Sequence, residues 1–199
     1  MFKQLVPTAI GNALFDSLYH EINWTNPGMP RFTYFMANCL CPYKYSKHSI
    51  KSAPWHNELY QLVVHLCQIL KLNVTFDCAN LNLYEGTNQS VGWHADDEDK
   101  FGSMPTILSI SLGSSRLFQL RTLQTPHEYD SFVLDHLDVC LMQGNLQSTH
   151  EHQVPKQFPN DPTSIRINIT ARVSTICTCG PTYHVSKVNT PFIYHDLSS

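Results

Sequence analysis

The segment from Ile165 to Val173 alternates strictly between apolar and polar residues, and this alternation limits the possible fold more than any other stretch does. Successive side chains of a β-strand point to opposite faces, so the pattern predicts a strand with one aliphatic face and one polar face. The polar face consists of Arg166, Asn168, Thr170 and Arg172. This face is either exposed to solvent or forms an anion-binding row, because an arginine guanidinium matches the two oxygens of a carboxylate.

Helical patterns dominate the first part of the chain, and strand-like patterns follow. Apolar residues at helical spacing predict amphipathic helices over residues 8–22 and 58–71. Five segments rich in β-branched or aromatic residues predict further strands at 74–84, 106–112, 116–121, 131–134 and 138–142. The turn at residues 113–115 predicts that the second and third of these strands pair as a hairpin. The order favours an α+β domain, in which helices back a sandwich or jelly-roll sheet.

Residues 24–57 show no usable periodicity and are rich in proline, asparagine and aromatic residues. We expect an irregular loop there. Its aromatic side chains, Tyr34, Phe35, Tyr43 and Tyr45 among them, either cap the core or face a ligand.

The composition restricts the class of protein. A chain of 199 residues is expected to form one domain with a full core. A net charge of -3 with 13 Lys and Arg argues against a generally basic nucleic-acid binder, although a local basic groove is possible. Seven cysteines without paired zinc-type spacing indicate thiols in a reducing compartment. With no signal-peptide pattern and no apolar run near ~18 residues, we expect an intracellular monomer, cytoplasmic or nuclear, without membrane attachment.

Residues 82–96 end in a His-x-Asp pair, His94 and Asp96. On a strand or strand end, residues two apart point the same way, so the imidazole and the carboxylate would converge. A third ligand follows downstream, either His150 or His152, ahead of the arginine-bearing strand. Two histidines and one carboxylate leave three positions of an iron open, as in non-haem Fe(II) oxygenases. A dicarboxylate cosubstrate held by arginines would fill two of these positions, and O2 the third.

Four motifs together resemble the AlkB family of 2-oxoglutarate- and iron-dependent dioxygenases, in particular homologues that act on alkylated nucleic acid. They are Asn82-x-Tyr84, the segments 93–98 and 105–113, and Arg166-x-Asn168-x-Thr170-x-Arg172. The pieces Pro30–Thr33 and Pro42–Ser46 are similar to the substrate-facing loop of those homologues. The resemblance implies a double-stranded β-helix (jelly-roll) core backed by helices in a domain over residues 1–175, followed by a C-terminal extension over 176–199.

The resemblance also implies roles for individual residues. It implies an Fe(II) site formed by His94, Asp96 and His152, because the family's third ligand usually precedes an apolar-Pro stretch. It implies a 2-oxoglutarate site formed by Asn82, Tyr84, Arg166, Asn168 and Arg172. Glu98 corresponds to an acidic residue near the substrate base, where opposite charge would favour a cationic methylated base. Weaker candidates for stacking against that base are Tyr34, Tyr45 and Trp93.

The implied reaction is oxidative demethylation of 1-methyladenine or 3-methylcytosine in single-stranded RNA or DNA. It would use Fe(II), O2 and 2-oxoglutarate and release formaldehyde and succinate. The target base must leave its stack, which is easiest in a single strand. Two alternatives stay open: the same chemistry on a protein or lipid, and a nucleic-acid-binding module without catalysis.

Overall fold

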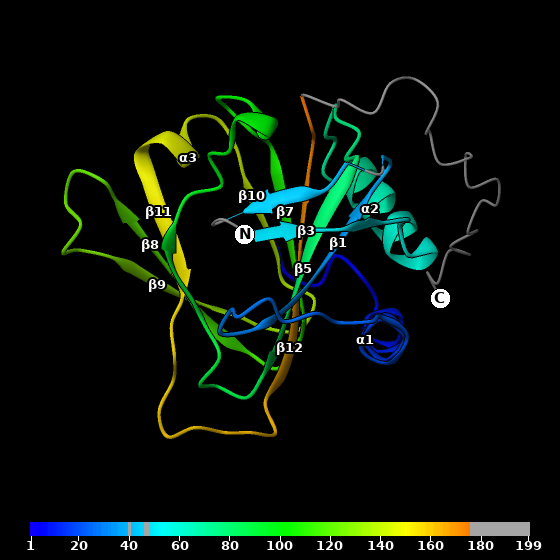
Figure 1. Cartoon of the computed structure of the whole chain (residues 1–199), viewed down its shortest axis with the longest axis horizontal. Coiled ribbons are helices and arrows are strands. Elements are labelled where there is room, and N and C mark those ends of the chain that lie inside the picture. The colour runs from blue at the N-terminus through cyan, green and yellow to red at the C-terminus, as the bar shows by residue number, and fades with distance from the viewer. Residues whose placement is uncertain (40, 46–47, 176–199) are drawn as a thin grey trace.

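Two facing β-sheets form the centre of the molecule in the computed structural model shown in Figure 1, which describes residues 1–39, 41–45 and 48–175. Helices α1 and α2 lie on the outer side of the larger sheet, and the smaller sheet covers its other side (Figure 1). This arrangement confirms the predicted α+β class with a jelly-roll core. The predicted extension over residues 176–199 lies outside the described residues.

The element bounds define the two sheets. The helices are α1 (Thr8–Glu21), α2 (Asn57–Ile69) and α3 (Leu146–Thr149), with the 3-10 helix η1 (Asp99–Phe101). The larger sheet runs in the order β10 (Val139–Met142), β7 (Ile107–Gly113), β12 (Ile165–Arg172), β5 (Cys78–Glu85), β1 (Phe32–Ala37) and β4 (Ser52–Ala53). The smaller sheet runs in the order β6 (Val91–His94), β11 (His150–Val154), β8 (Arg116–Thr122) and β9 (Asp130–Leu134). Strands β2 (Tyr43–Tyr45) and β3 (His48–Ile50) form a separate pair.

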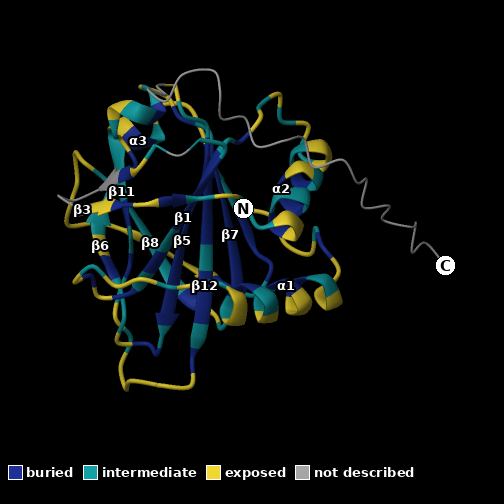
Figure 2. Ribbon diagram, turned by 45° about the vertical axis from the view of Figure 1, so that its right-hand side comes forward, coloured by how far each residue is buried: buried dark blue, intermediate teal, exposed yellow. Residues whose placement is uncertain are grey.

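Both predicted helices are confirmed, and each buries its apolar stripe. Helix α1 buries Leu14 and Leu18, and α2 buries Leu59, Leu62 and Leu66. These side chains join one cluster with the aliphatic residues of β5, β7 and β12. Burial of a leucine contributes roughly 2 kcal/mol, so this layer supplies much of the stability. Figure 2 shows the buried strands between the helices and the smaller sheet.

The alternation of β12 sends its polar residues to the side away from the helices. Ile167 and Ile169 pack in the helix-facing cluster, whereas Arg166 and Arg172 point into the space between the sheets, with 0% and 3% of their surface exposed. The solvent-exposed interpretation of this polar face is therefore wrong. Strand β5 repeats the pattern beside β12, and Asn82 pairs with Asn168 in the antiparallel ladder. The polar rows of the two strands thus form one wall of a site.

Two sequence expectations are corrected by the structure. The region expected to be an irregular loop contains β1, which pairs with β5 from Phe32 to Ala37. Both faces of β1 pack against other parts of the protein, so its sequence shows no alternation to detect. The expected hairpin of β7 and β8 does not form, because β10 and β12 occupy both edges of β7 and β8 belongs to the other sheet.

Candidate metal centre

Two histidines meet through the pairing of β6 and β11. His94 is the register partner of His152 in this antiparallel ladder, and their ring centres lie 4.3 Å apart. The His94 Nδ1 lies 2.8 Å from the carbonyl oxygen of Gly92. A carbonyl only accepts hydrogen bonds, so Nδ1 carries the proton and Nε2 keeps its lone pair for a metal.

Asp96 completes the group from the loop that follows β6. Its Oδ1 lies 4.0 Å from His94 Nε2, and the ligand atoms of Asp96, His94 and His152 all lie within 4.8 Å of one another. His150 is not part of this group; its Nδ1 lies 2.8 Å from the Thr149 hydroxyl. The fold therefore brings together the three predicted ligands and separates the alternative histidine from them.

An ion pair fixes the charges at this group. The Arg172 Nη2 and the Asp96 Oδ2 lie 2.6 Å apart, and both side chains are buried. Burial would raise the pKa of Asp96, but the charges of Arg172, His152 and His94 together outweigh burial and hold this pKa at about 2. Burial, and then the neighbouring His94, lower the pKa of His152 to about 4. Near neutral pH, Asp96 is thus a carboxylate and His152 a neutral imidazole, the forms that bind a metal.

The residues present fit Fe(II) and 2-oxoglutarate. Two imidazoles and one carboxylate match the ligand set of non-haem iron oxygenases, with positions left open. The guanidinium groups of Arg166 and Arg172 both have a buried Nε and Nη1 without a hydrogen-bond partner among the described residues. Buried donors of this kind are costly unless they are paired, and the carboxylates of 2-oxoglutarate would pair them.

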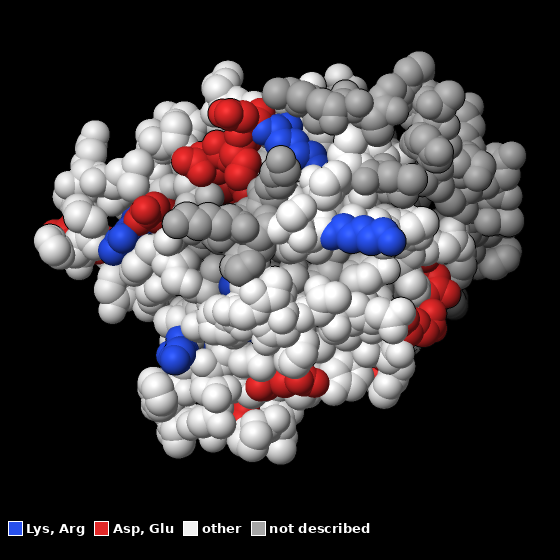
Figure 3. Space-filling view, in the orientation of Figure 1, with Lys and Arg blue, Asp and Glu red and all other residues white. Residues whose placement is uncertain are grey.

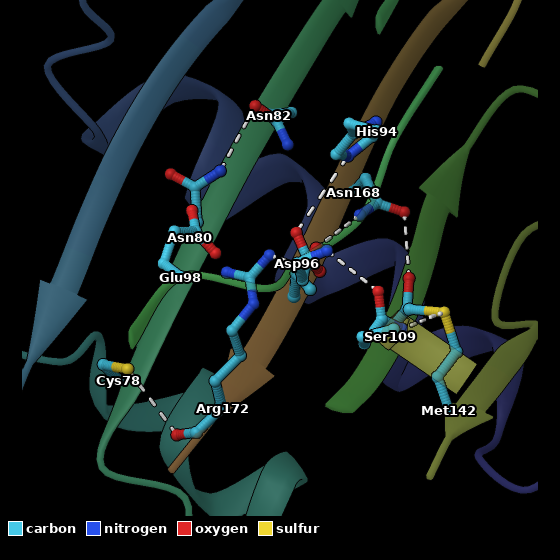
Figure 4. A network of polar contacts seen from close by, with 12 residues as sticks. Cys78, Asn80, Asn82, His94, Asp96, Glu98, Ser109, Met142, Asn168 and Arg172 are labelled. Carbon is cyan, nitrogen blue, oxygen red and sulfur yellow. Dashed lines mark hydrogen bonds and ion pairs between the residues drawn. The ribbon is translucent and has the colours of Figure 1, made fainter. Parts of the chain in front are cut away.

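Polar side chains from β5 and β12 line the cavity between the sheets, which also contains the three ligands; we call it the metal cavity. Asn82, Tyr84 and Asn168, for which the resemblance implied a 2-oxoglutarate site, all line it. Figure 4 shows the side chains of Asn80 and Asn82 on one side of Asp96 and Arg172, and Asn168 on the other. The cavity is therefore polar where the two strands face the ligands.

The two arginines of β12 differ in position. Arg172 lines the metal cavity, whereas Arg166 lies behind it and donates from Nη2 to Ser111 Oγ and Asn168 Oδ1, at 2.9 and 2.7 Å. The Arg166 guanidinium carbon is 5.5 Å from the centre of the Tyr84 ring. Burial lowers the pKa of Arg166 to about 10, so the group stays charged at neutral pH. The two guanidinium groups therefore differ in their neighbours: Arg172 pairs with Asp96, and Arg166 with Ser111 and Asn168.

Glu98, for which the resemblance implied a place near the substrate base, shares a cavity lining with the metal-site residue His94. The Tyr43 hydroxyl donates to Glu98 Oε1 at 2.7 Å, while Glu98 Oε2 is buried without a hydrogen-bond partner among the described residues. Burial raises the pKa of Glu98. Glu98 and His94 both line a second, open cavity of about 770 Å³, which we call the outer cavity. His94 lines both cavities, so the outer cavity adjoins the metal centre.

Two of the three weaker substrate candidates, Trp93 and Tyr34, do not line either cavity. Trp93 lies on the opposite face of β6 from His94, and the Arg121 guanidinium carbon is 4.2 Å from the centre of its ring. Tyr34 packs at the helix-facing core, with its ring centre 6.5 Å from that of Trp24. The side chain of Tyr45 lies outside the described residues. Neighbouring strand residues alternate between faces, which explains why Trp93 and Tyr34 point away.

Two further residues belong to the site and were missed by sequence reasoning. Arg31 is buried in the metal cavity and donates from Nε to Asn82 Oδ1 at 2.8 Å. Its place after Pro30, in a segment that resembles the family, was an available signal. Gln147 accepts a hydrogen bond from the main-chain N–H of Asp96 at 2.8 Å. No sequence signal marks Gln147, because only the fold brings α3 beside the metal ligands.

Comparisons with known proteins agree with this site. The family model described as the 2OG-Fe(II) oxygenase superfamily matches residues 1–172. The human protein "Alpha-ketoglutarate-dependent dioxygenase alkB homolog 3" is 33% identical over 140 residues, which are 66% of this chain and 48% of that protein. The Arabidopsis thaliana "DNA oxidative demethylase ALKBH2" is 28% identical over 205 residues, covering 86% of this chain and 64% of that protein. The chain thus spans about half to two thirds of the length of these relatives.

A viral protein and a solved structure extend the comparison. The "RNA-directed RNA polymerase" of Lolium latent virus is 29% identical over 162 residues, which are 81% of this chain and 9% of that protein. The solved structure titled "The structure of OsALKBH1" matches with a TM-score of 0.63 at 14% identity, covering 86% of this chain and 95% of that chain. At this identity, the match shows a shared fold.

In the described part of this chain, no helix has both the length and the apolar character needed to cross a membrane. The chain belongs to the 2OG-Fe(II) oxygenase superfamily and, within it, to the AlkB family of dioxygenases, with Fe(II) and 2-oxoglutarate as cofactors.

Proposed function

We propose that this protein demethylates N-alkylated bases, 1-methyladenine and 3-methylcytosine, in single-stranded RNA or DNA. The observation that carries the proposal is the Glu98 carboxylate, which lines the open outer cavity next to His94 and has one buried oxygen without a hydrogen-bond partner in the part of the chain that the structure describes. Both proposed bases are cationic, and a partly desolvated carboxylate attracts a cation strongly. The name of the Arabidopsis relative, a DNA oxidative demethylase, supports the same reaction.

The residues of the site divide the work. When bound, Fe(II) with 2-oxoglutarate and O2 would supply the oxidation of the N-methyl group to N-hydroxymethyl, which releases formaldehyde; succinate and CO2 would be the coproducts. His94, Asp96 and His152 hold the metal. Arg172 keeps Asp96 ionised and, with Arg166, provides donors for the cosubstrate carboxylates. The base enters through the outer cavity, which requires that it first leave its stack.

The charge around the entrance favours a second candidate, the same chemistry on a cationic group of a protein. Besides Glu98, the outer cavity is lined by Asp97 and Glu151 and by no lysine or arginine among the described residues. Acidic side chains also gather on the face shown in Figure 3. Such a rim repels phosphates, so a nucleic-acid strand would have to keep its backbone away from it. Because the viral relative is named an RNA-directed RNA polymerase, RNA is tested as a substrate as well as DNA.

A substrate panel tests the proposal. Purified protein with Fe(II), O2 and 2-oxoglutarate is incubated with single-stranded RNA and DNA oligonucleotides that carry 1-methyladenine or 3-methylcytosine, and with methyl-lysine peptides. We expect formaldehyde and succinate in equal amounts from the methylated oligonucleotides, and no formaldehyde from unmethylated ones or from the His94→Ala variant. Formaldehyde from the peptides alone would replace the nucleic-acid assignment with the protein one.

The Glu98→Gln substitution tests the role of the carboxylate. It removes the charge but keeps the size of the side chain, so we expect kcat/KM on 1-methyladenine to fall about tenfold or more, the usual effect of losing a charged partner. Turnover of a neutral N-methylated base should change much less. The control is Asp99→Asn, which removes an exposed charge one residue away. Equal losses on the cationic and the neutral base would contradict the assigned role.

A further inference from the structure

Asp96 is held differently from the two histidine ligands. His94 and His152 are register partners in the β6–β11 ladder, whose main-chain hydrogen bonds fix their positions. Strand β6 ends at His94, so Asp96 lies two residues beyond the ladder. The ion pair with Arg172 holds the Asp96 carboxylate, but it does not hold the main chain from which that carboxylate extends. Another contact is required to fix the main chain of the loop.

We propose that Gln147 is a positioning residue that fixes the main chain of Asp96 and thereby the geometry of the metal centre. Its Oε1 accepts the Asp96 N–H at 2.8 Å, and only 4% of its surface is exposed. Its Nε2 lies 3.6 Å from the Met142 sulfur, which orients the amide so that its oxygen faces the N–H. A buried main-chain N–H needs a partner, so losing this acceptor would favour a shift of the loop.

The place of Gln147 in the chain couples the ligands. Helix α3, which carries Gln147, leads directly into β11, which carries His152. One continuous segment therefore supplies both the ligand His152 and the Gln147 side chain, which accepts the main-chain N–H of the ligand Asp96. Groups that orient a metal ligand typically change metal affinity by 10–100-fold when they are removed. The inference rests on the metal centre of the proposed enzyme and not on the identity of its substrate.

Metal affinity, measured without turnover, tests this inference. Co(II) is titrated into the metal-free protein in the presence of 2-oxoglutarate, and its visible d–d absorption reports both affinity and ligand geometry. For Gln147→Leu we expect a Kd at least tenfold higher and a changed spectrum. For Gln147→Glu we expect a Kd within about threefold of the unsubstituted protein, because a carboxylate oxygen accepts the same hydrogen bond.

The matched control is Gln153→Leu. Gln153 is a half-buried glutamine that neighbours His152 in β11, and its amide donates to Gln119 Oε1 at 2.7 Å on the outer face of the sheet. We expect this variant to bind Co(II) as the unsubstituted protein does. If Gln147→Leu does not fold, Gln147→Asn replaces it, since its amide is one methylene too short to reach Asp96, and the same loss of affinity is expected.

The outcomes separate this inference from the proposed function. An unchanged Co(II) affinity and spectrum in Gln147→Leu, with a lower melting temperature of the metal-free protein, would show a structural role only and overturn the inference. Loss of affinity in Gln147→Glu equal to that in Gln147→Leu would overturn it as well. Failure of the unsubstituted protein to bind Co(II) would instead remove the metal centre, and the proposed function with it.

Discussion

The side chains at the metal centre set one another's protonation states. Arg172 keeps Asp96 ionised in a site where burial alone would favour its neutral form. Asp96 in turn raises the pKa of Arg172 against the effect of burial. His152 is held neutral mainly by burial. Near neutral pH, Asp96 and His152 of the metal-free protein are therefore already in the deprotonated forms that bind a metal. Metal binding then displaces no proton from either side chain.

This protonation predicts how the stability of the metal-free protein depends on pH. The pKa of His152 falls from an ordinary 6.5 to about 4 on folding, so between these values the unfolded chain binds a proton that the folded protein does not. The free energy of unfolding should therefore decrease as the pH is lowered from 6.5 to 4, by about 3 kcal/mol from this residue. Asp96, with a pKa of about 2, loses its stabilising effect only below this window.

Urea unfolding in the presence of a chelator, at pH 6.5 and pH 4.5, measures this effect. His152→Gln should show a markedly smaller loss of stability between the two values. Burial also lowers the pKa of His136, but this residue is present in both proteins and cancels in the difference. The same pH dependence in both proteins would mean that His152 is not held neutral by the fold.

At the scale of elements, strand alternation places the site and its support on opposite faces of the same strands. In β5 and β12, aliphatic residues pack against the helices while polar residues line the metal cavity. Strand β12 lies between β5 and β7, so the end of β7 also limits how far β12 is paired. Gly113 ends β7 with a φ of +86° and pairs with Arg166. The turn at Gly113 then takes the chain across to β8 in the smaller sheet.

The Gly113→Ala substitution should destabilise the protein by about 2 kcal/mol or more. A left-handed backbone costs a residue with a Cβ roughly 1–2 kcal/mol. The added Cβ would also meet the Ile165 carbonyl oxygen and lie 2.7 Å from the Phe15 ring. The control is Gly144→Ala, where φ is +66° but nothing lies within 4 Å of the added Cβ. Urea unfolding gives both values, and equal losses would mean that the contacts at Gly113 add nothing.

At the scale of the whole molecule, the metal centre connects parts of the protein that the chain separates widely. Its ligands come from β6, the following loop and β11 in the smaller sheet, while Arg172 comes from β12 in the larger sheet. The Asp96–Arg172 ion pair is a direct link between the two sheets. A bound metal with its cosubstrate would add further links across the metal cavity, and these links exist only in the folded state.

Metal and cosubstrate together should therefore stabilise the folded protein. At concentrations of Mn(II) and 2-oxoglutarate about 100 times their Kd, each saturated site adds roughly 2.7 kcal/mol. For a chain of this size, each ligand should therefore raise the melting temperature by about 5–10 °C. A thermal melt with and without the ligands measures the shift. It should vanish in His94→Ala and persist in His20→Ala, which changes an exposed histidine in α1. A shift that persists in His94→Ala would place the metal elsewhere.

Sequence patterns predicted those features that depend on neighbours in the chain. The alternation of residues 165–173, the two helical stripes and the His94-x-Asp96 pair reflect local periodicity, and the structure contains each of them. Resemblance to a known family supplied the choice of His152, which spacing had left open against His150. The order of the strands within each sheet could not be predicted, because pairing depends on which strand edges are free. The predicted hairpin of β7 and β8, which does not form, shows this.

The sequence by itself determined the fold class, the metal-binding residue types and the polar face of β12, because these follow from side-chain chemistry and from periods of 2 and 3.6 residues. Only the tertiary structure decided that this polar face is buried, that Trp93 and Tyr34 point away from the metal, and that Gln147 contacts Asp96. These outcomes depend on which elements pack across the space between the two sheets. Such contacts join residues far apart in the chain, and no local pattern encodes them.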